Sequence, residues 1–332
     1  LIEKAPFETL CQIGLLINTN LTDSESTNII NGLDVSITSS FLTSDTLGRI
    51  LECEEIYKLD ILKNIAPKEI QLSNEVTEIE YVVKLQKTSP VFLRCIGAQK
   101  HLAPQLVLNN IEHKLVNQNC LLVKASSKLD TLNAVAKKEF YVQDWASQQT
   151  LNFIDCNDSE TWWDVCSGAG GKSLLMLSAH KKLQIVASDI RKTIIHNYKK
   201  RLAFYGYAPK AKSIDIINQP ITIPHLNGAV IDAPCTGSGV WGRTPEGISQ
   251  ITAKAVKSYQ AKQKAICSTV VKNLPNGGKL TYITCSVFKA ENEDVSAFIH
   301  NTLGLKLIKQ GIIHNHELNS DYLFAAQFIK QT

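Results

Sequence analysis

The stretch TWWDVCSGAGGKSLLMLSAH, residues 161–180, carries the pattern that decides the fold. It begins with a short apolar run typical of a buried strand, continues through a glycine-rich turn, and ends in a sequence that favours a helix. Small residues let the backbone of such a turn approach a ligand closely, and the following helix N-terminus favours negative charge. The stretch therefore predicts the first strand, turn and helix of an α/β domain.

The same alternation continues toward the end of the chain. Apolar strand patterns recur at LQIVASD (183–189), GAVIDAPC (228–235) and KLTYITC (279–285), and helical patterns separate them. The longest of these helices, in residues 249–274, is expected to stop at Pro275. Alternating strands and helices predict a parallel sheet with helices on both faces, and ligands bind beyond the carboxyl ends of the strands in such sheets.

The glycine-rich turn does not by itself identify a ligand. A phosphate-binding P-loop would need glycine where Cys166 stands, and the dinucleotide fingerprint would need a third glycine where Ser173 stands. Asp189 closes the second predicted strand, where a carboxylate can accept hydrogen bonds from ribose hydroxyls or cap the next helix. Asp215 is expected at the end of another strand, either as a contact to an adenine amino group or as an ordinary loop acid.

Two cysteines occupy matching places at the ends of predicted strands. Cys235 follows Asp232 through Pro234, which stiffens the turn, and Cys285 directly follows the strand pattern of KLTYIT. A single cysteine is usually a small apolar residue of the core. A thiolate, however, is a strong nucleophile, and a helix N-terminus or a nearby cation favours it. Two thiols in small, polar turns at neighbouring strand ends therefore indicate covalent chemistry.

Composition limits the class of protein. The 332 residues, 44% of them apolar and 20% charged, allow about two globular domains. Nine scattered cysteines without a Cys-x-x-Cys pair disfavour zinc and a disulfide framework, and they fit a reducing cytosol. No apolar run reaches the length of a membrane span, and the first residues lack a signal pattern. We therefore expect a cytoplasmic protein.

Three regions are expected along the chain. Residues 1–68 are predicted to be helical, and residues 146–332 form the α/β domain. Residues 69–145 read as a small α+β unit with one helix around LAPQLVLNNI and short strand-like runs at EYVVKL, PVFLRCI and CLLVKA. The first 80 residues hold 14 acids and 5 bases, whereas the rest of the chain holds 17 acids and 30 bases. This asymmetry indicates either an anionic partner for the C-terminal part or a solvated basic face.

Five motifs in one order carry a resemblance to a known family. They are VQDWASQ (142–148), DVCSGAGGKS (164–173), ASDIR (187–191), DAPCTGSGVWGRTPE (232–246) and YITCSVFKAENE (282–293). Together they resemble the NOL1/NOP2/Sun (Fmu) family of RNA 5-methylcytosine methyltransferases, over about residues 90–332. The combination of DAPC with TCS is the most specific part of the resemblance. SGAGG replaces the commoner A-x-P-G-G, and Thr236 stands where serine is more usual.

The resemblance implies both a fold and a mechanism. The fold is a Rossmann-like S-adenosylmethionine-dependent methyltransferase domain, with a small α+β RNA-binding domain and a helical N-terminal region. In the mechanism, the Cys285 thiolate adds to C6 of cytosine so that C5 can accept a methyl group. Cys235 assists release of the covalent adduct, and Asp232 contacts the N3/N4 edge of the base. Lys172 is expected near Asp232 and the cofactor.

The same resemblance implies S-adenosyl-L-methionine as the cofactor and no metal. We expect the cofactor to contact residues of the glycine-rich turn and residues near strand ends. These are Cys166, Ser167, Gly168, Ala169, Gly170, Gly171, Lys172, Asp189, Arg191, Asp215 and Asp232.

RNA is the expected partner, with ribosomal RNA as the first choice and tRNA as the second. No membrane or obligate protein partner is expected. The alternatives are a catalytically silent RNA-binding protein that assists ribosome assembly and a nucleotide-dependent oxidoreductase. Arg94 and Arg243 are candidate RNA contacts, and the alternative for each is a pair with a structural carboxylate. We expect one basic surface across the two folded units, with the acidic N-terminal region turned away from the RNA.

Overall fold

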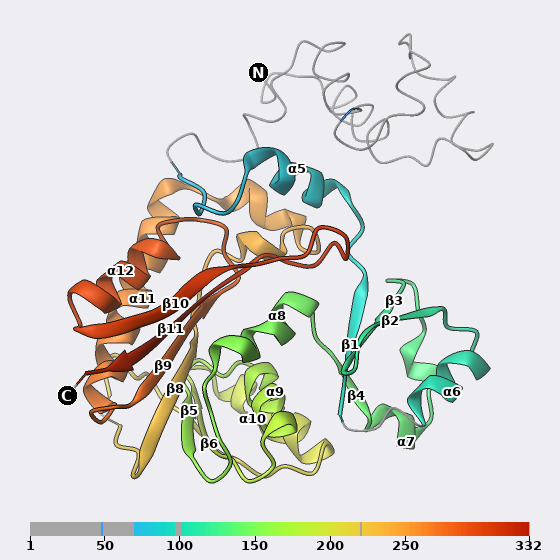
Figure 1. The fold of residues 1–332 in the computed structure, drawn as a ribbon, viewed down its shortest axis with the longest axis horizontal. Helices are drawn as coiled ribbons and strands as arrows, with labels where there is room; N and C mark the ends of the chain where they lie inside the picture. Colours follow the sequence, from blue (N-terminus) through green and yellow to red (C-terminus); the bar gives the residue numbers. More distant parts are fainter. Residues whose placement is uncertain (1–47, 49–69, 97–100, 220, 332) are drawn as a thin grey trace.

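The computed structural model describes residues 48, 70–96, 101–219 and 221–331. The predicted helical region 1–68, and with it the predicted orientation of the acidic segment, lies outside these residues except for Gly48. The described chain contains a seven-stranded sheet in the order β10-β11-β9-β8-β5-β6-β7 and a four-stranded sheet in the order β2-β3-β1-β4. Figure 1 shows the small sheet to one side of the large one.

The large sheet is almost entirely parallel. Strand β11 runs antiparallel to both of its neighbours, β9 and β10, and the other strands therefore share one direction. The strands are β5 (Thr161–Asp164), β6 (Gln184–Asp189), β7 (Lys210–Ser213), β8 (Leu226–Asp232), β9 (Lys279–Thr284), β10 (Leu305–Ile313) and β11 (Leu323–Lys330). The predicted parallel sheet is confirmed, with β11 as an antiparallel insertion that the sequence did not reveal.

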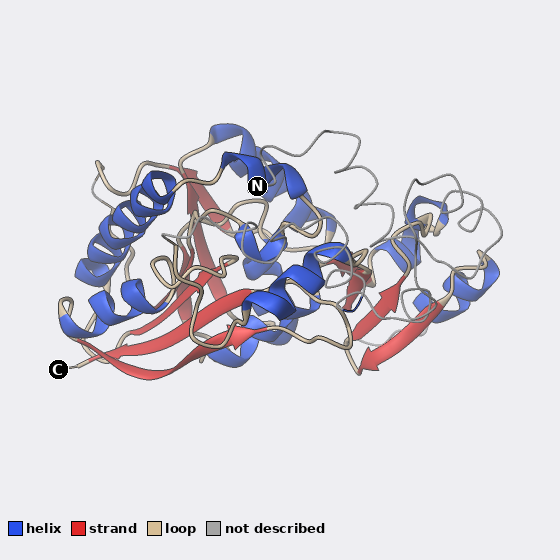
Figure 2. Ribbon diagram, turned by 90° about the horizontal axis from the view of Figure 1, so that it is seen from above, coloured by secondary structure: helices blue, strands red, loops and turns tan. Residues whose placement is uncertain are grey.

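Helices cover both faces of this sheet, as its doubly buried strands require. Trp162 and Trp163 of β5 are both fully buried, and they belong to core clusters on opposite faces. One face packs against α8 (Trp145–Gln149), α9 (Gly171–Ala179) and α10 (Lys192–Phe204), and the other against α11 (Ala253–Asn273) and α12 (Glu293–Asn301). The two helical layers flank the red strands in Figure 2.

The strand order reverses at β5, which positions the functional edge. From β5 the chain proceeds outward through β6 and β7, and it then returns to β8 on the other side of β5. The loops that follow β5 and β8 therefore diverge and leave a crevice at their carboxyl ends. The turn after β5 needs glycine at 170, where φ is +85° and an added Cβ would lie 2.8 Å from the Tyr198 ring.

The small sheet is antiparallel and has its own core. Its strands are β1 (Val91–Cys95), β2 (His113–Asn117), β3 (Cys120–Val123) and β4 (Phe140–Val142), and its helices are α6 (Leu102–Leu108) and α7 (Ala134–Lys137). Leu93, Leu106 and Leu121 are buried together in this core. The helix predicted around LAPQLVLNNI and the strands at PVFLRCI and CLLVKA are confirmed.

One predicted strand is wrong, because EYVVKL is helical. It lies in α5 (Glu78–Gln86), where the Thr77 hydroxyl donates to the Glu80 carboxylate at 2.6 Å and accepts from the Glu80 amide at 3.3 Å. This capping box starts a helix despite the strand propensity of Tyr81, Val82 and Val83. The Tyr81 hydroxyl donates to the Ser238 carbonyl at 2.7 Å, so α5 packs on the large unit. The division of the chain into domains at residues 69 and 145 stays a prediction.

The long predicted helix is confirmed at its end and starts later than expected. α11 begins at Ala253, because Thr252 accepts a hydrogen bond from the Ala255 amide at 3.1 Å and caps the helix. Short 3-10 helices complete the described elements: Leu129–Thr131, Thr150–Phe153, Ser238–Val240 and Pro245–Gln250. None of the described helices combines the length and the apolar content that crossing a membrane would require.

Candidate active site

The structure brings the two predicted thiols together. β8 and β9 are parallel neighbours, so the turn that carries Cys235 after β8 meets Cys285 directly after β9. The two Sγ atoms lie 3.4 Å apart, and both side chains are half-buried. Two free thiols in contact at the carboxyl ends of neighbouring strands can both reach one group bound beside them.

Backbone hydrogen bonds lock the two cysteine turns to each other. The Gly239 amide donates to the Cys285 carbonyl at 2.9 Å, and the Tyr322 amide donates to the Gly239 carbonyl at 3.1 Å. A Cβ added at Gly239 would lie 1.9 Å from the Tyr322 oxygen, so only glycine fits here. Gly239, the second glycine of the GSG sequence after Cys235, is therefore required because the Tyr322 backbone approaches it closely.

Contact between the two thiols restrains their ionisation. The contact with Cys285, together with burial, raises the pKa of the Cys235 thiol well above its usual value. Two adjacent thiols cannot both carry charge, because like charges in contact disfavour ionisation. At most one member of the pair can therefore ionise while the other keeps its proton.

A buried lysine links the glycine-rich turn to the end of β8. Lys172, the second residue of α9, has a side chain only 7% exposed, and its Nζ lies 3.1 Å from the Asp232 carboxylate. The same Nζ donates to the Ser147 hydroxyl at 2.8 Å. The Asp232 side chain is 35% exposed. Lys172 therefore fixes Asp232 with the carboxylate turned toward the crevice.

A buried carboxyl group, that of Asp164, lies directly before the glycine-rich turn. Burial raises the pKa of Asp164 to about 6, although the Ser173 hydroxyl donates to it at 2.5 Å. The Tyr198 hydroxyl donates in turn to Ser173 at 2.8 Å. One Asp164 oxygen and the hydroxyl oxygen of Ser167 are buried and make no hydrogen bond within the described chain. The turn and the strand end before it therefore hold polar atoms for which the described residues supply no partner.

Asp189 ends β6 as predicted, and Arg191 holds it. The Arg191 guanidinium donates to both Asp189 oxygens at 3.0 Å, and the Gly168 amide donates at 3.1 Å. Burial acts to raise the pKa of Asp189, but the hydrogen bonds from Arg191 outweigh it and leave the pKa below its usual value. The Asp189 carboxylate is therefore ionised and already paired.

A cavity of about 380 Å³ opens beside these residues at the carboxyl ends of β5, β6 and β8. Asp189, Asp215 and Asp232 line it, together with the exposed apolar side chains of Ile190 and Ile217. The other lining residues with polar or sulfur-containing side chains are Cys166, Arg191, Tyr259 and Lys262. The cavity therefore offers carboxylates around an apolar surface.

The two arginines predicted to contact RNA lie in different surroundings. Arg243 forms an ion pair with Asp321, whose side chain is 1% exposed. Arg94 of β1 lies opposite Tyr141 of β4, on the same face of the small sheet, and Tyr141 packs in the core of the large unit. The Nε atom of Arg94 is buried without a hydrogen-bond partner in the described chain. Arg243 thus has the structural carboxylate that was the alternative to RNA, and the RNA roles of both arginines stay predictions.

The sequence pattern of the 16S rRNA methyltransferase RsmB/F family matches residues 151–329, more than half of the chain. The chain belongs to this family. Ribosomal RNA small subunit methyltransferase B of Serratia proteamaculans is 29% identical over 199 residues, which cover 57% of this chain and 46% of that protein. The protein of the same name from Shewanella oneidensis is 26% identical over 278 residues, which cover 74% of this chain and 64% of that protein. The chain spans about half the length of the first of these relatives.

Solved structures share the fold at lower identity. The crystal structure of PH0851 superposes with a TM-score of 0.73 at 21% identity, over 92% of this chain and 72% of that one. NSun6 from Pyrococcus horikoshii, solved with SFG, gives a TM-score of 0.68 at 17% identity, over 82% and 97%. These similarities confirm the Rossmann-like fold.

The RsmB/F family is one of S-adenosylmethionine-dependent methyltransferases, and the crevice fits that cofactor. An added Cβ at Gly168, where φ is +51°, would meet nothing within 4 Å, so the turn is open on that side. The unpartnered Ser167 hydroxyl and Asp164 oxygen lie in the same turn. Carboxylates suit ribose hydroxyls and a cationic methyl donor, and the isoleucines suit an adenine ring.

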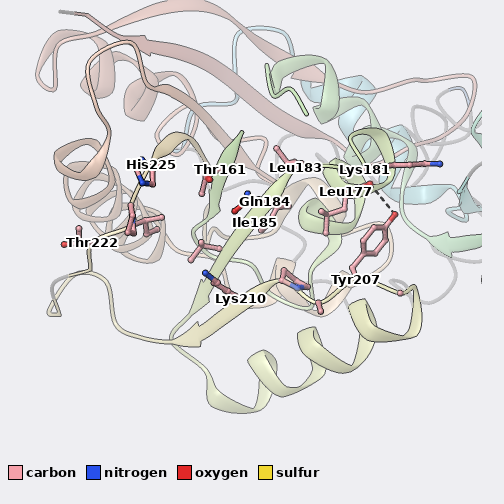
Figure 3. Close-up of a pocket in the computed structure, with 16 residues that line it drawn as sticks. Thr161, Leu177, Lys181, Leu183, Gln184, Ile185, Tyr207, Lys210, Thr222 and His225 are labelled. Atoms are coloured by element: carbon pink, nitrogen blue, oxygen red, sulfur yellow. Dashed lines mark hydrogen bonds between the residues drawn. The ribbon is translucent and has the colours of Figure 1, made fainter. Parts of the chain in front are cut away.

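A larger cavity, of about 630 Å³, lies at the opposite edge of the sheet. Figure 3 shows Lys181, Lys210 and His225 among its lining, around the beginnings of β5, β6 and β7. The described residues that line it include no carboxylate and no thiol. Nor do the described residues contain a cluster of His, Cys, Asp and Glu that could hold a metal ion.

Sequence reasoning missed two residues that contact the candidate site residues. Ser147, in the VQDWASQ motif, contacts Lys172, and Glu291, in the ENE of the last motif, contacts both cysteine turns. Their motifs were the only available signal, because the chain gives no local pattern for contacts between residues 25 and 55 positions apart.

Proposed function

We propose that the chain is an S-adenosylmethionine-dependent RNA cytosine-5 methyltransferase that acts on 16S ribosomal RNA. The observation that carries the proposal is the pair of free thiols 3.4 Å apart at the carboxyl ends of β8 and β9. Methyl transfer to an oxygen or an exocyclic nitrogen needs no thiol. Cytosine C5 is a poor nucleophile and needs covalent activation, which a thiolate supplies.

Cys285 is the proposed nucleophile. Its thiolate forms a bond to C6 of the cytosine, the C5–C6 double bond opens, and C5 becomes enamine-like. When bound, the cofactor supplies an electrophilic methyl group to this carbon. A base then takes the C5 proton, the electron pair of the C5–H bond re-forms the C5–C6 double bond, and the C6–S bond breaks with its electron pair on sulfur, which restores the aromatic ring and the Cys285 thiolate. Cys235, whose Sγ lies 3.4 Å from that of Cys285, is proposed to assist this release.

Asp232 is proposed to bind the N3/N4 edge of the base. Its carboxylate is partly exposed to the crevice, and the ion pair with Lys172 holds it in place. Charge accumulates on the pyrimidine ring when a thiolate adds to C6, and a carboxylic acid or a protonated ring nitrogen at N3 can balance it. The buried Lys172 ties Asp232 to the helix that follows the glycine-rich turn, so base and cofactor sites share one rigid support.

Cofactor contacts are proposed from the turn at residues 166–171, from Asp189 and from Asp215. Ribose hydroxyls can reach Asp189 only if Arg191 gives up at least one of its two contacts, and the Arg191 side chain is 60% exposed and free to turn outward. The Asp215 carboxylate accepts hydrogen bonds from the Ile217 amide at 3.1 Å and the Asn218 amide group at 2.8 Å, which fixes its direction.

The test is a methylation assay with the purified chain, S-adenosylmethionine, and either 16S rRNA or a tRNA pool. We expect 5-methylcytosine, detected by mass spectrometry of digested nucleosides, in the 16S rRNA reaction. Bisulfite sequencing of that RNA then gives the position. Detection of 5-methylcytosine in tRNA alone would mean that tRNA, and not 16S rRNA, is the substrate. RNA binding without methylation, under conditions in which S-adenosylhomocysteine stabilises the protein, would favour a silent assembly factor.

A further inference from the structure

A fully buried carboxylate lies between the two cysteine turns. Glu291, in the loop between β9 and α12, is 0% exposed. One of its oxygens accepts hydrogen bonds from the Thr236 amide at 3.0 Å and from the Gln263 side chain at 3.1 Å. The other accepts from the Thr236 hydroxyl at 2.6 Å and from the Ser286 hydroxyl at 2.5 Å. All four donors are uncharged groups, so this is not a salt bridge.

The donors are the residues that set the two thiols. Thr236 directly follows Cys235, and Ser286 directly follows Cys285. Gln263 of α11 also donates to the Pro234 carbonyl at 3.0 Å, so the backbone on both sides of Cys235 is held. One carboxylate therefore joins the turn after β8, the turn after β9 and the long helix behind them.

Glu291 is itself rigidly placed. The Tyr282 hydroxyl, from β9, donates to its carbonyl at 2.7 Å, and its amide donates to the Phe288 carbonyl at 3.0 Å. The neighbouring Asn292 donates to the Ser286 carbonyl at 2.8 Å. Burying a carboxylate is costly unless hydrogen bonds compensate it, and four donors that would themselves be unpaired without Glu291 do so here. The arrangement therefore supplies something other than packing.

We infer that Glu291 is a positioning residue, which sets the distance and orientation of the Cys235 and Cys285 thiols without touching the substrate. The thiols take part in catalysis only under the proposed function, and the inference rests on it to that extent. The geometric part, that Glu291 controls the spacing of the thiols, is independent of any reaction with RNA.

Disulfide formation measures this spacing in the absence of RNA. Sulfur atoms 3.4 Å apart need only a small movement to form a bond of about 2.05 Å. Diamide takes two electrons and two protons from such a pair, forming the disulfide while its own N=N bond becomes a hydrazine N–N bond. The rate is followed by mass spectrometry of the joined Cys235 and Cys285 peptides.

The decisive variant is Glu291→Gln. A glutamine either turns its N–H₂ group toward the Thr236 amide and the Gln263 side chain, which leaves these donors unpaired, or turns it toward the Thr236 and Ser286 hydroxyls, which then lose their acceptor and must reorient. Either arrangement disturbs one of the two turns. We expect cross-linking about tenfold slower than in the wild type. Asp294→Asn is the matched control, because it removes the same charge three residues later, at an exposed position in the first turn of α12. Its cross-linking rate should stay within twofold of the wild type.

A second pair of variants decides the matter if Glu291→Gln does not fold. Thr236→Val removes the hydroxyl that donates to Glu291, and Thr236→Ser keeps it. Thr236→Val should slow cross-linking severalfold, and Thr236→Ser should slow it less. Among folded proteins, equal rates for Glu291→Gln and wild type would overturn the inference, and so would equal rates for the two Thr236 variants.

Methylation kinetics separate positioning from general structural support. Glu291→Gln should lower kcat about tenfold or more, while affinities for RNA and S-adenosylhomocysteine change less than twofold. A parallel loss of affinity would show that Glu291 holds up the whole crevice and would overturn a specific positioning role. Slower cross-linking together with a wild type that does not methylate RNA would leave the geometric role of Glu291 standing and reject the proposed function instead.

Discussion

The two edges of the seven-stranded sheet carry cavities of opposite character. The amino edge has the larger one, about 630 Å³, lined by cations, hydroxyls and apolar groups (Figure 3). The carboxyl edge has the smaller one, about 380 Å³, with three carboxylates in its lining and with Lys172 paired to one of them. The candidate cofactor contacts belong to the smaller cavity, so cavity size is a poor guide to the site in this fold.

The difference follows from chain topology. At the carboxyl edge the loops after β5 and β8 diverge, and each strand ends in a polar or nucleophilic residue that the sheet holds in register. At the amino edge, the loops only return the chain from the helices to the strands. Lys181, Lys210 and His225 there face no carboxylate of the described lining. Preorganised polar groups, rather than space, distinguish the two edges.

The largest expected difference between the two edges comes from replacing the proposed nucleophile. Cys285→Ala should lower methylation by at least about 10⁴-fold, because no other group in the proposed mechanism can activate cytosine C5. S-Adenosylhomocysteine binding, measured by calorimetry, should be unchanged, since Cys285 does not line the cofactor cavity. Lys210→Ala, in the amino-edge cavity, is the control and should retain wild-type turnover. Robust methylation by Cys285→Ala would break the assignment.

Cys235→Ala tests whether the two thiols have different roles. Without the proposed release step, RNA should accumulate as a covalent complex that survives denaturing electrophoresis. The double variant with Cys285→Ala should form no complex, because the bond to C6 is made by Cys285. A complex that needs Cys235 and forms without Cys285 would reverse the two roles.

Asp189→Ala should give a smaller effect, confined to cofactor binding. Hydrogen bonds from ligand hydroxyls to a carboxylate contribute about 1.5–3 kcal/mol each, and part of this is offset because Arg191 must be displaced. We therefore expect S-adenosylhomocysteine affinity to fall by about tenfold, with RNA affinity unaltered. Arg191→Ala provides the sharper comparison: it should leave cofactor affinity equal or higher if Arg191 competes with the ribose. Unchanged affinity in Asp189→Ala would exclude the ribose contact.

Much of this site could be predicted because local patterns fix it. Strand ends can be predicted from the sequence, and parallel strands bring their ends to one edge, which places Asp189, Cys235 and Cys285 at the same edge of the sheet. The helix α5 could not be read in the same way, because Tyr81, Val82 and Val83 favour a strand and only the Thr77 cap and contacts with the large unit decide otherwise.

Pairings between distant residues were beyond the sequence for another reason. Arg243 and Asp321 are 78 positions apart, and Gln263 and Glu291 are 28 apart on different elements. No periodicity encodes such pairs, since they depend on how loops close after the sheet has formed. The resemblance to the family identified the ENE motif, but only the structure gives Glu291 its partners.

The smallest expected effect concerns the pH dependence of stability at the carboxyl edge. Burial lowers the pKa of His314 from 6.5 to about 4, and its ring stacks on Tyr322 at 3.8 Å. Between these values the unfolded chain binds a proton that the folded chain does not, so the free energy of unfolding must decrease as pH falls from about 6.5 toward 4. Because His314 is only partly buried, we expect a loss of about 1–2 kcal/mol.

Urea unfolding of wild type and His314→Gln, from pH 7 to pH 4.5, isolates this contribution. The pKa of Asp144 is raised to about 6 by burial and acts in the opposite direction in the same range, but it is present in both proteins and cancels in the difference. The wild-type curve should therefore decline more steeply than that of His314→Gln. His225→Gln, at the amino-edge cavity, controls for loss of a histidine elsewhere on the sheet. Parallel curves for wild type and His314→Gln would mean that His314 is protonated as readily in the folded chain as in the unfolded one, and that the carboxyl edge is more open to water than its contacts with Asp321 and Tyr322 indicate.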